Sequence, residues 1–292
     1  MATLEQPTTE AELWDALALH ANPCPLAGGT DLLVQMRSGH RQPECIVDIK
    51  RLPRFSAISS SDGKIRIGAA VSCRDIALAM ADEPGMDAIT ELCELIGSRQ
   101  IQNRATFGGN VCNASPAADS VPLLMAMGAR YVLVSRDGVR NMPAEDFAMA
   151  PGRTVLRPGE LLQSIDLPPK PVGTGEAYLR VTPRTEMDIA IASAGARVQI
   201  DDSGVCTGMR IAIGGVASKV LLLEEAAQVL VGSELGAGSL EEFARLVRKR
   251  ADPIDDVRAT RDYRRHVIGV LAKRAATRAR DRAVASRLRE RL

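Results

Sequence analysis

The chain has 292 residues, of which 46% are hydrophobic and 25% charged, and its formal net charge at pH 7 is +1. A chain of this size can bury a large core and form two domains. Its near-neutral charge and its 3% of aromatic residues do not favour nucleic acid as a partner. No apolar stretch reaches the ~18 residues that span a bilayer, and the N-terminus lacks a secretion signal, so we expect a cytoplasmic protein without membrane insertion.

The six cysteines are scattered and none belongs to a C-x-x-C pair, which argues against a zinc knuckle or an iron–sulfur binding run. We therefore expect reduced thiols and no metal site in this chain. The three histidines are His20, His40 and His266. They suggest no arrangement of nucleophile, base and acid, so we assign no catalytic residue.

The first part of the chain predicts a small lobe of helices and strands. Apolar residues at helical spacing predict a helix over 9–19, which Thr8 or Thr9 would cap. A helical turn is expected at 32–36, and β-branched residues predict a strand at 45–49.

A second lobe is expected to follow, with strands and amphipathic helices in alternation. The segment 101–118 has little periodicity and many small and amide residues, so we expect it to be a ligand-binding loop. The predicted elements are strands at 63–69, 130–134 and 161–167, a capped helix from 72–76, and helices at 86–96 and 122–128.

Proline and glycine dominate residues 168–175, where neither a helix interior nor a central strand is favoured, so we place a domain boundary there. The third region is predicted to be α+β, with a strand pair at 190–200 and 205–214 and then mostly helix. The resulting division is a domain at 1–170, with lobes at about 1–55 and 56–170, and a domain at 175–292.

Residues 273–292 contain many arginines among alanines and few acids. A patch for nucleic acid or membrane is one interpretation. A solvated helix face or a docking surface for a partner subunit is the commoner one, and we assign the segment no chemistry.

Two glycine-rich segments are the most informative feature of the sequence. Residues 27–31 read A-G-G-T-D, and residues 106–110 read T-F-G-G-N. Glycine lets backbone N–H groups approach an oxygen-rich ligand, and successive N–H groups can form a nest for phosphate. The first segment lacks the G-x-G-x-x-G spacing of a Rossmann domain, and alone it is equally well a tight turn. Together the segments predict an anionic nucleotide held from two sides.

These segments, extended to A-G-G-T-D-L at 27–32 and T-F-G-G-N-V-C-N-A-S-P-A-A-D-S at 106–120, resemble those of the FAD-binding subunits of molybdenum hydroxylases. That family includes the medium chain of carbon monoxide dehydrogenase and the flavin subunit of bacterial xanthine dehydrogenases. The resemblance covers essentially the whole chain and includes the pattern R-x-x-x-R-x-x-x-D-I-A at 180–190. Phe107 departs from the commoner isoleucine, and its bulk would alter access to the flavin.

The resemblance implies a two-lobed FAD-binding domain of the vanillyl-alcohol-oxidase (PCMH) type, followed by a smaller C-terminal domain of sheet and helices. It also implies which residues hold FAD. The pyrophosphate would lie against Ala27, Gly28, Gly29, Thr30, Asp31, Leu32, Leu33 and Val34. The second lobe would contribute Thr106, Gly108, Gly109 and Asn110, and further contacts would come from Asp119, Leu162 and Arg180.

Several of these side chains also have structural interpretations. Asp119 is implied to accept hydrogen bonds from sugar hydroxyls, or else it caps the following helix. Asp31 has the same capping alternative. Arg180 would stabilise negative charge on a reduced flavin, while both it and Arg184 are open to ordinary surface ion pairs.

The function that the resemblance implies is electron transfer within a heteromeric molybdenum hydroxylase. FAD would lie in this chain, molybdopterin in a large partner and two [2Fe–2S] clusters in a small partner. The flavin would pass electrons to NAD, a quinone or oxygen. An independent FAD-dependent reductase of related fold, or a non-enzymatic scaffold that has lost the cofactor, are the alternatives; the substrate and the acceptor stay open.

Overall fold

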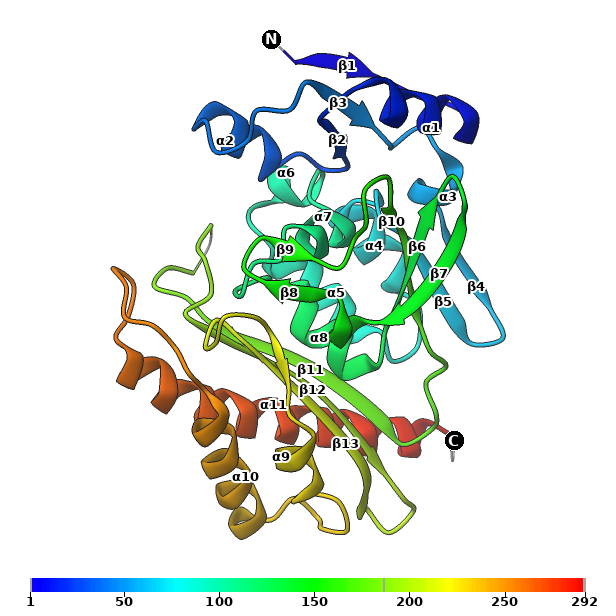
Figure 1. The fold of residues 1–292 in the computed structure, drawn as a ribbon. Coiled ribbons are helices and arrows are strands. Elements are labelled where there is room, and N and C mark those ends of the chain that lie inside the picture. The colour runs from blue at the N-terminus through cyan, green and yellow to red at the C-terminus, as the bar shows by residue number, and fades with distance from the viewer. Residues whose placement is uncertain (1, 186, 291–292) are drawn as a thin grey trace.

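The computed structural model describes residues 2–185 and 187–290. The chain forms three layers, shown from top to bottom in Figure 1: a small N-terminal lobe, a second lobe, and a sheet covered by helices. Helices and strands are mixed throughout, which confirms the α+β class. Among the described residues, none of the helices is both long and apolar enough to cross a membrane.

The N-terminal lobe is a three-stranded parallel sheet with strand order β1-β3-β2, covered by helices. Thr9 caps the first helix: its Oγ1 accepts from the Glu12 backbone N at 3.2 Å, and the Glu12 carboxylate accepts from the Thr9 backbone N at 3.3 Å. This capping box fixes the start of the helix where the sequence predicts it. The elements are β1 (Thr3–Glu5), α1 (Glu10–Leu19), β2 (Pro23–Leu26), α2 (Leu32–Arg37) and β3 (Cys45–Asp48).

The second lobe is built on a five-stranded antiparallel sheet with strand order β4-β5-β10-β6-β7. Its strands are β4 (Ile58–Ser61), β5 (Lys64–Gly68), β6 (Arg130–Ser135), β7 (Gly138–Pro143) and β10 (Leu161–Leu167), with a small pair β8 (Ala148–Ala150) and β9 (Arg153–Thr154). Its helices are α3 (Pro53–Ser56), α4 (Cys73–Met80), α5 (Asp87–Leu95), α6 (Arg99–Gln102), α7 (Phe107–Cys112) and α8 (Ser120–Met127), with a 3-10 turn at Ala144–Asp146.

The segment 101–118 is not the loop that its composition predicts, because it contains the end of α6 and all of α7. Thr106 caps α7 by accepting a hydrogen bond from the Gly109 backbone N at 2.9 Å. Gly108 is buried against Ala69, so packing supports a helix that two glycines would weaken in isolation.

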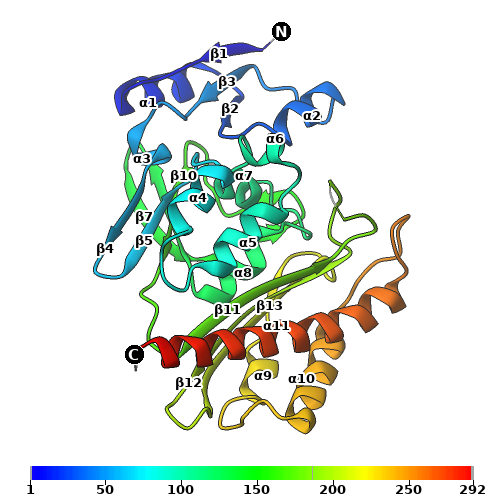
Figure 2. The same cartoon turned by 180° about the vertical axis from the view of Figure 1, so that it is seen from behind.

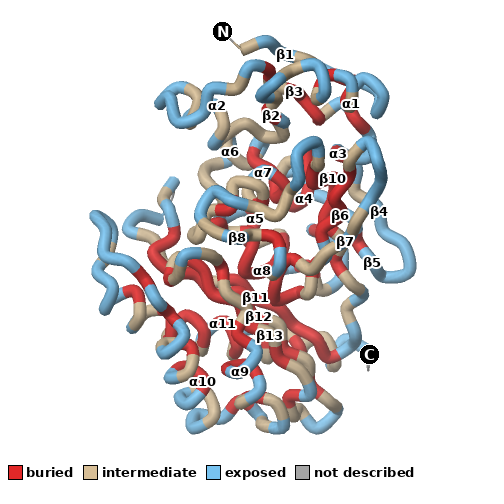
Figure 3. Tube along the Cα trace, in the orientation of Figure 1, coloured by how far each residue is buried: buried red, intermediate tan, exposed pale blue. Residues whose placement is uncertain are grey.

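The third layer is an antiparallel sheet with strand order β11-β12-β13-β14. Helix α8, buried along its whole length, contacts β12 and β13, while α11 crosses β11 and β12 from the other side (Figures 2 and 3). The elements are β11 (Thr174–Val181), β12 (Ala192–Ile200), β13 (Cys206–Gly214), β14 (Leu221–Leu222), α9 (Glu224–Gln228), α10 (Ala237–Arg250) and α11 (Arg261–Glu290). The predicted strand pair and the mainly helical remainder are confirmed.

Strand β11 begins inside the segment 168–175, where we expect only a connection. The prolines end at Pro171, and β11 pairs with β12 from Thr174 onward. The structure therefore limits the irregular connection to the residues between β10 and β11. That the two parts are separate domains stays a prediction.

The arginine-rich helix α11 is more than a solvated or docking face, because it also forms core. Its small side chains at helical spacing are fully buried: Ala272, Ala275, Ala276, Ala279 and Ala283. Gly175 lets β11 approach so closely that a Cβ there would lie 2.1 Å from the Ala279 carbonyl oxygen. The arginines between the alanines make ion pairs, including Arg278 with Glu91 of α5 at 2.7 Å.

Candidate functional site

A cavity of about 700 Å³ lies where the two lobes meet. Its walls come from β2 and the following glycine segment, from α7, from the segment around β9 and β10, and from a loop after β11. Its volume is within the ~300–1,000 Å³ typical of small-molecule sites. The cavity is therefore the candidate site for the nucleotide that the sequence predicts.

The first glycine segment connects β2 to α2. Gly29 has a φ of +79°, which favours glycine, and Gly28 lies so close to the second lobe that a Cβ would be 2.0 Å from the Arg104 carbonyl oxygen. Within the described residues, the backbone N–H groups of Gly28, Gly29 and Thr30 donate no hydrogen bond to the protein. This wall of the cavity thus offers backbone donors that no protein acceptor occupies.

The second glycine segment forms the start of α7. A Cβ at Gly108 would lie 2.3 Å from the Ala69 carbonyl oxygen, whereas one at Gly109 would meet only the Thr106 hydroxyl, at 3.1 Å. Gly108 is therefore required by packing. Gly109 lines the cavity, where the lack of a side chain leaves the helix backbone accessible.

A polar bridge joins the two segments. The Asn113 side chain, directly after α7, accepts from Gln35 Nε2 at 3.0 Å and donates to Asp31 Oδ2 at 3.3 Å. Asp31 makes no capping hydrogen bond to α2, and burial raises the pKa of its carboxyl group above the usual value. Its side chain helps to fix the lobes, and the capping alternative is wrong.

Asp119 does not cap α8 either. That helix start is held by Asn110, whose Oδ1 accepts from the Ser120 backbone N at 3.0 Å and from the Ser120 hydroxyl at 2.7 Å. Asn110 lines the cavity, but its side-chain oxygen is used in hydrogen bonds within the protein.

The Asp119 carboxylate instead accepts from the Tyr178 hydroxyl at 2.6 Å and from Arg180 Nη1 at 2.7 Å. Burial, reinforced by the Asp119 charge, raises the pKa of Tyr178 well above its usual value. Arg180 is 6% exposed and also bonds the Leu95 carbonyl oxygen at 2.5 Å. Tyr178 and Arg180 of β11 thus connect the C-terminal sheet to Asp119 in the cavity wall. The Asp119 carboxylate still has lone pairs that can accept hydrogen bonds from a ligand.

Glu160, directly before β10, also lines the cavity. Arg140 donates to its two oxygens at 2.7 Å each, and the Arg157 backbone N donates at 2.8 Å. The Arg140 guanidinium, which outweighs the effect of burial, lowers the pKa of Glu160 to about 2. This carboxylate therefore stays charged.

The loop after β11 reaches the cavity with Met187, Asp188 and Ile189. Arg184 bonds Asp188 Oδ2 and the Met187 carbonyl oxygen, both at 3.1 Å. Arg184 thus braces the loop, which agrees with its structural interpretation.

Most residues proposed from the sequence to hold FAD line this one cavity. They are Ala27, Gly28, Gly29, Thr30, Asp31, Leu32, Val34, Thr106, Gly108, Gly109, Asn110, Asp119 and Leu162. Leu33 and Arg180 are not in the wall. Leu33 is 49% exposed, and Arg180 reaches the wall through Asp119.

Arg41 is a cavity residue that the sequence analysis misses. Its backbone N donates to the Gln35 carbonyl oxygen at 3.2 Å, and its Nη1 lies 3.8 Å from Cys24 Sγ. It adds a cation to the side of the first glycine segment. A lone arginine after a predicted helical turn gives no sequence signal for such a place.

Two family models match the chain. The FAD-binding domain in molybdopterin dehydrogenases matches residues 1–170, and the C-terminal domain of the carbon monoxide dehydrogenase flavoprotein matches residues 177–279. The chain belongs to this flavoprotein family. The resemblance read from the glycine segments is thereby confirmed, as is the order of an FAD-binding domain and a C-terminal domain.

Individual proteins similar to this chain support the same family assignment. The carbon monoxide dehydrogenase medium chain of Afipia carboxidovorans is 33% identical over 259 residues, which cover 89% of each chain. The xanthine dehydrogenase FAD-binding subunit of Escherichia coli O157:H7 is 29% identical over 95% of this chain and 96% of its own. The solved Cu,Mo-CO dehydrogenase in its cyanide-inactivated form is 30% identical, with a TM-score of 0.91 over 96% of this chain and 98% of that one. The flavoprotein is therefore an oxidoreductase subunit.

Proposed function

We propose that this chain is the electron-transfer subunit of a molybdenum hydroxylase, in which FAD occupies the cavity between the lobes. The observation that carries the proposal is the meeting of the two glycine segments in one cavity of nucleotide size. Electrons would come from [2Fe–2S] clusters in a small partner, after substrate oxidation at molybdopterin in a large partner. The naming of relatives as medium chains and FAD-binding subunits supports such an assembly.

The residues of the cavity fit an extended dinucleotide. The N–H groups of Gly28, Gly29 and Thr30, together with the Arg41 cation, suit a diphosphate, which needs donors and positive charge. Asp119 would accept hydrogen bonds from sugar or ribityl hydroxyls at the other end. Leu162 and Ile101 offer apolar walls for a ring system. Arg180 would act on the cofactor only through Asp119.

Bound FAD would supply the capacity to take up and release electrons singly or in pairs. The protein would bind and orient it and exclude water from one face. No side chain is assigned a proton-transfer role, because the substrate chemistry would lie in the partner. NAD, a quinone or oxygen are the candidate acceptors. The six cysteines are all free, which suits the reducing cytoplasm where we place the complex.

Purification of the chain alone tests the cofactor assignment. We expect a flavin absorbance spectrum, or its recovery on incubation with FAD, with about one FAD per chain. Failure to take up FAD would overturn the assignment and favour a scaffold without cofactor.

Purification of the tagged chain from its native host tests the assembly. We expect molybdenum, iron and flavin to co-elute in fixed ratio on size exclusion, and the flavin to be reduced when the substrate of the complex is added. A flavin-loaded chain without molybdenum or iron that is reduced directly by a nicotinamide would instead identify an independent reductase.

A further inference from the structure

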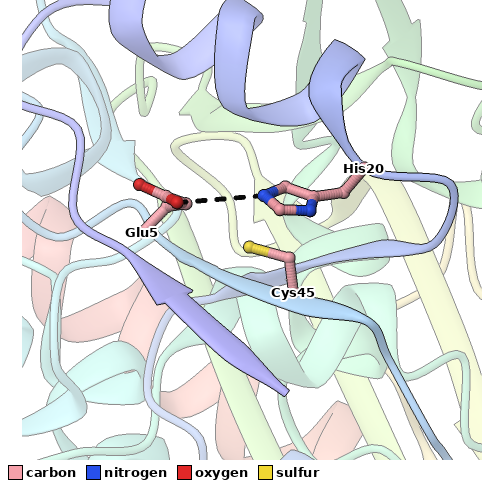
Figure 4. Close-up of side chains that lie close together, drawn as sticks. All are labelled: Glu5, His20 and Cys45. Carbon is pink, nitrogen blue, oxygen red and sulfur yellow. Dashed lines mark ion pairs between the residues drawn. The ribbon is translucent and has the colours of Figure 1, made fainter. Parts of the chain in front are cut away.

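Three side chains that are typical metal ligands meet in the N-terminal lobe, and none of them lines the cavity. Figure 4 shows Glu5 from the end of β1, His20 from the turn after α1 and Cys45 from the start of β3. Their ligand atoms lie within 4.8 Å of one another. The three residues come from separate elements, so no local sequence motif marks them.

His20 has an unusual environment for a polar side chain. Its Nε2 atom is buried and finds no hydrogen-bond partner among the residues that the structure describes, and Glu5 Oε1 lies 3.8 Å away, too far for a hydrogen bond. A buried nitrogen without a partner costs free energy that the fold normally recovers by pairing. A ligand between Nε2 and the carboxylate would satisfy both atoms.

The Cys45 side chain lies beside Glu5 and His20, below them in Figure 4. Cys45 is fully buried, and its Sγ makes only a weak contact with the Ile46 carbonyl oxygen at 3.5 Å. Glu5, by contrast, has a side chain that is 45% exposed. The cluster therefore consists of a fully buried thiol, a partly buried histidine whose Nε2 atom is enclosed, and a carboxylate that opens to solvent.

Neighbouring hydrogen bonds hold the three elements in place. The Glu44 carboxylate, adjacent to Cys45, accepts from the Ala21 backbone N at 2.9 Å, and the Thr3 backbone N donates to the Glu44 carbonyl oxygen at 3.0 Å. The turn that contains His20 and the strand that contains Glu5 are thus both fixed to the start of β3. Such support keeps ligands oriented before a metal binds.

We propose that Glu5, His20 and Cys45 form a site for Zn²⁺ or a divalent ion of similar softness, with water as the fourth ligand. Thiolate, imidazole and carboxylate are together the ligand set of zinc, whereas magnesium and calcium require oxygen ligands. The ligand atoms would move together slightly to reach bonding distance. Binding would release the Cys45 thiol proton to solvent and would join β1, α1 and β3 through one ion.

The site would stabilise the N-terminal lobe and would be independent of FAD. Its sheet contains only three short strands, and two prolines in β2 reduce the hydrogen bonding available to it. A metal bound to three elements compensates for a small core. Because the thiol and the imidazole must lose their protons, zinc affinity should fall as the pH is lowered.

The experiment uses the untagged full-length chain, with and without FAD, titrated with Zn²⁺ against a chromophoric chelator. We expect about one tightly bound Zn²⁺ per chain in both forms and a rise in Tm of about 5 °C at saturation, reversed by a stronger chelator. Addition of Co²⁺ should produce the charge-transfer band of a cobalt–thiolate bond.

Cys45→Ser and His20→Gln should each weaken zinc binding by about 100-fold or more, since loss of even an outer hydrogen-bond partner of a metal ligand costs about 10–100-fold. His40→Gln and Cys206→Ser are the matched controls: His40 is an exposed histidine bonded to Ser38, and Cys206 is a buried cysteine in the C-terminal sheet. Both should bind zinc as the wild type does. Absence of zinc binding and of a Tm shift in the wild type would overturn the proposal, as would unchanged binding in Cys45→Ser and His20→Gln.

Discussion

The glycine pairs 28–29 and 108–109 line the same cavity from two lobes, yet their surroundings differ. The first belongs to a partly exposed loop, whose N–H groups donate to no acceptor in the described part of the chain, and the α2 helix after it has no buried residue. The second lies in a capped helix, where Gly108 is pressed against the backbone of Ala69. The first pair therefore combines close packing at Gly28 with N–H groups left for a ligand, and the second is shaped chiefly by the core.

The same dipeptide can therefore serve different purposes in one molecule. At Gly28 the missing side chain allows one lobe to approach the other, and at Gly29 it allows a positive φ. At Gly108 it allows a helix to approach a strand end. Substitutions can separate these contributions, because stability and FAD binding are measured independently.

The largest effect is expected for Gly108→Ala. The added methyl group would overlap the Ala69 carbonyl group, and rigid backbone cannot move aside cheaply, so the free energy of unfolding should fall by about 3 kcal/mol. Gly109→Ala is the adjacent control and should change it by less than about 1 kcal/mol, because alanine favours helix. Denaturant unfolding measures both. Equal losses in the two variants would contradict a packing role specific to Gly108.

Two carboxyl groups that line the cavity, Glu160 and Asp31, should also respond oppositely to acid. Glu160 has a pKa lowered to about 2, so its stabilising effect is complete above the unfolded value near 4.5 and is lost as the pH falls toward 2. Glu160→Gln should therefore cost about 2 kcal/mol at pH 7 and progressively less below pH ~4.

Asp31 should respond in the opposite direction, because burial raises the pKa of its carboxyl group. Its protonation stabilises the folded state at low pH, and this contribution is lost as the pH rises, so Asp31→Asn should lose no stability at pH 7. Unfolding curves at several pH values test both variants. A Glu160→Gln effect that does not shrink in acid would refute the ionic explanation.

Gly28→Ala should act on the cofactor as well as on the contact between the lobes. The methyl group would meet the Arg104 carbonyl oxygen and displace the loop from the second lobe, so we expect FAD affinity to fall about ten-fold, equivalent to ~1.4 kcal/mol. Gly238→Ala, at an open position of α10, should leave affinity unchanged. Fluorescence titration of the FAD-free chain provides the measurement. Wild-type affinity in Gly28→Ala would show that the loop does not position FAD.

The smallest effect is expected at the bridge between the two segments. Asn113→Ala removes the contacts with Gln35 and Asp31 and should cost about 1 kcal/mol in the free energy of unfolding. Gln35→Ala should cost less, and the double variant should cost less than the sum, because both changes remove one shared bond. Strict additivity would indicate that the bridge is not formed in solution.

The sequence predicts the regular elements and both glycine segments well, because these depend on local periodicity, capping and turn chemistry. Thr9 caps its helix as predicted, and the strand pair in the C-terminal sheet lies where it is predicted. Strand β1 is missed because three residues are too short for a pattern. Helix α7 is missed because its glycines resemble a loop until Ala69 packs against them.

Contacts between distant residues lie beyond sequence reasoning of this kind. Nothing local indicates that Asp119 pairs with Tyr178 and Arg180, or that Arg41 reaches the cavity. Each depends on how the third layer and the lobes are placed against one another. The roles of individual residues toward FAD therefore remain predictions, while the family and the fold are established.

The position of α11 has a consequence for how the protein is made. The strands β11 and β12 need this helix to cover one face, yet the ribosome produces it long after them. The two N-terminal lobes can fold during synthesis, whereas the face of the sheet that α11 covers must wait, with its buried alanine positions exposed to solvent. A nascent chain stalled before Arg261 should therefore be a client for chaperones, and one that has released Glu290 should not.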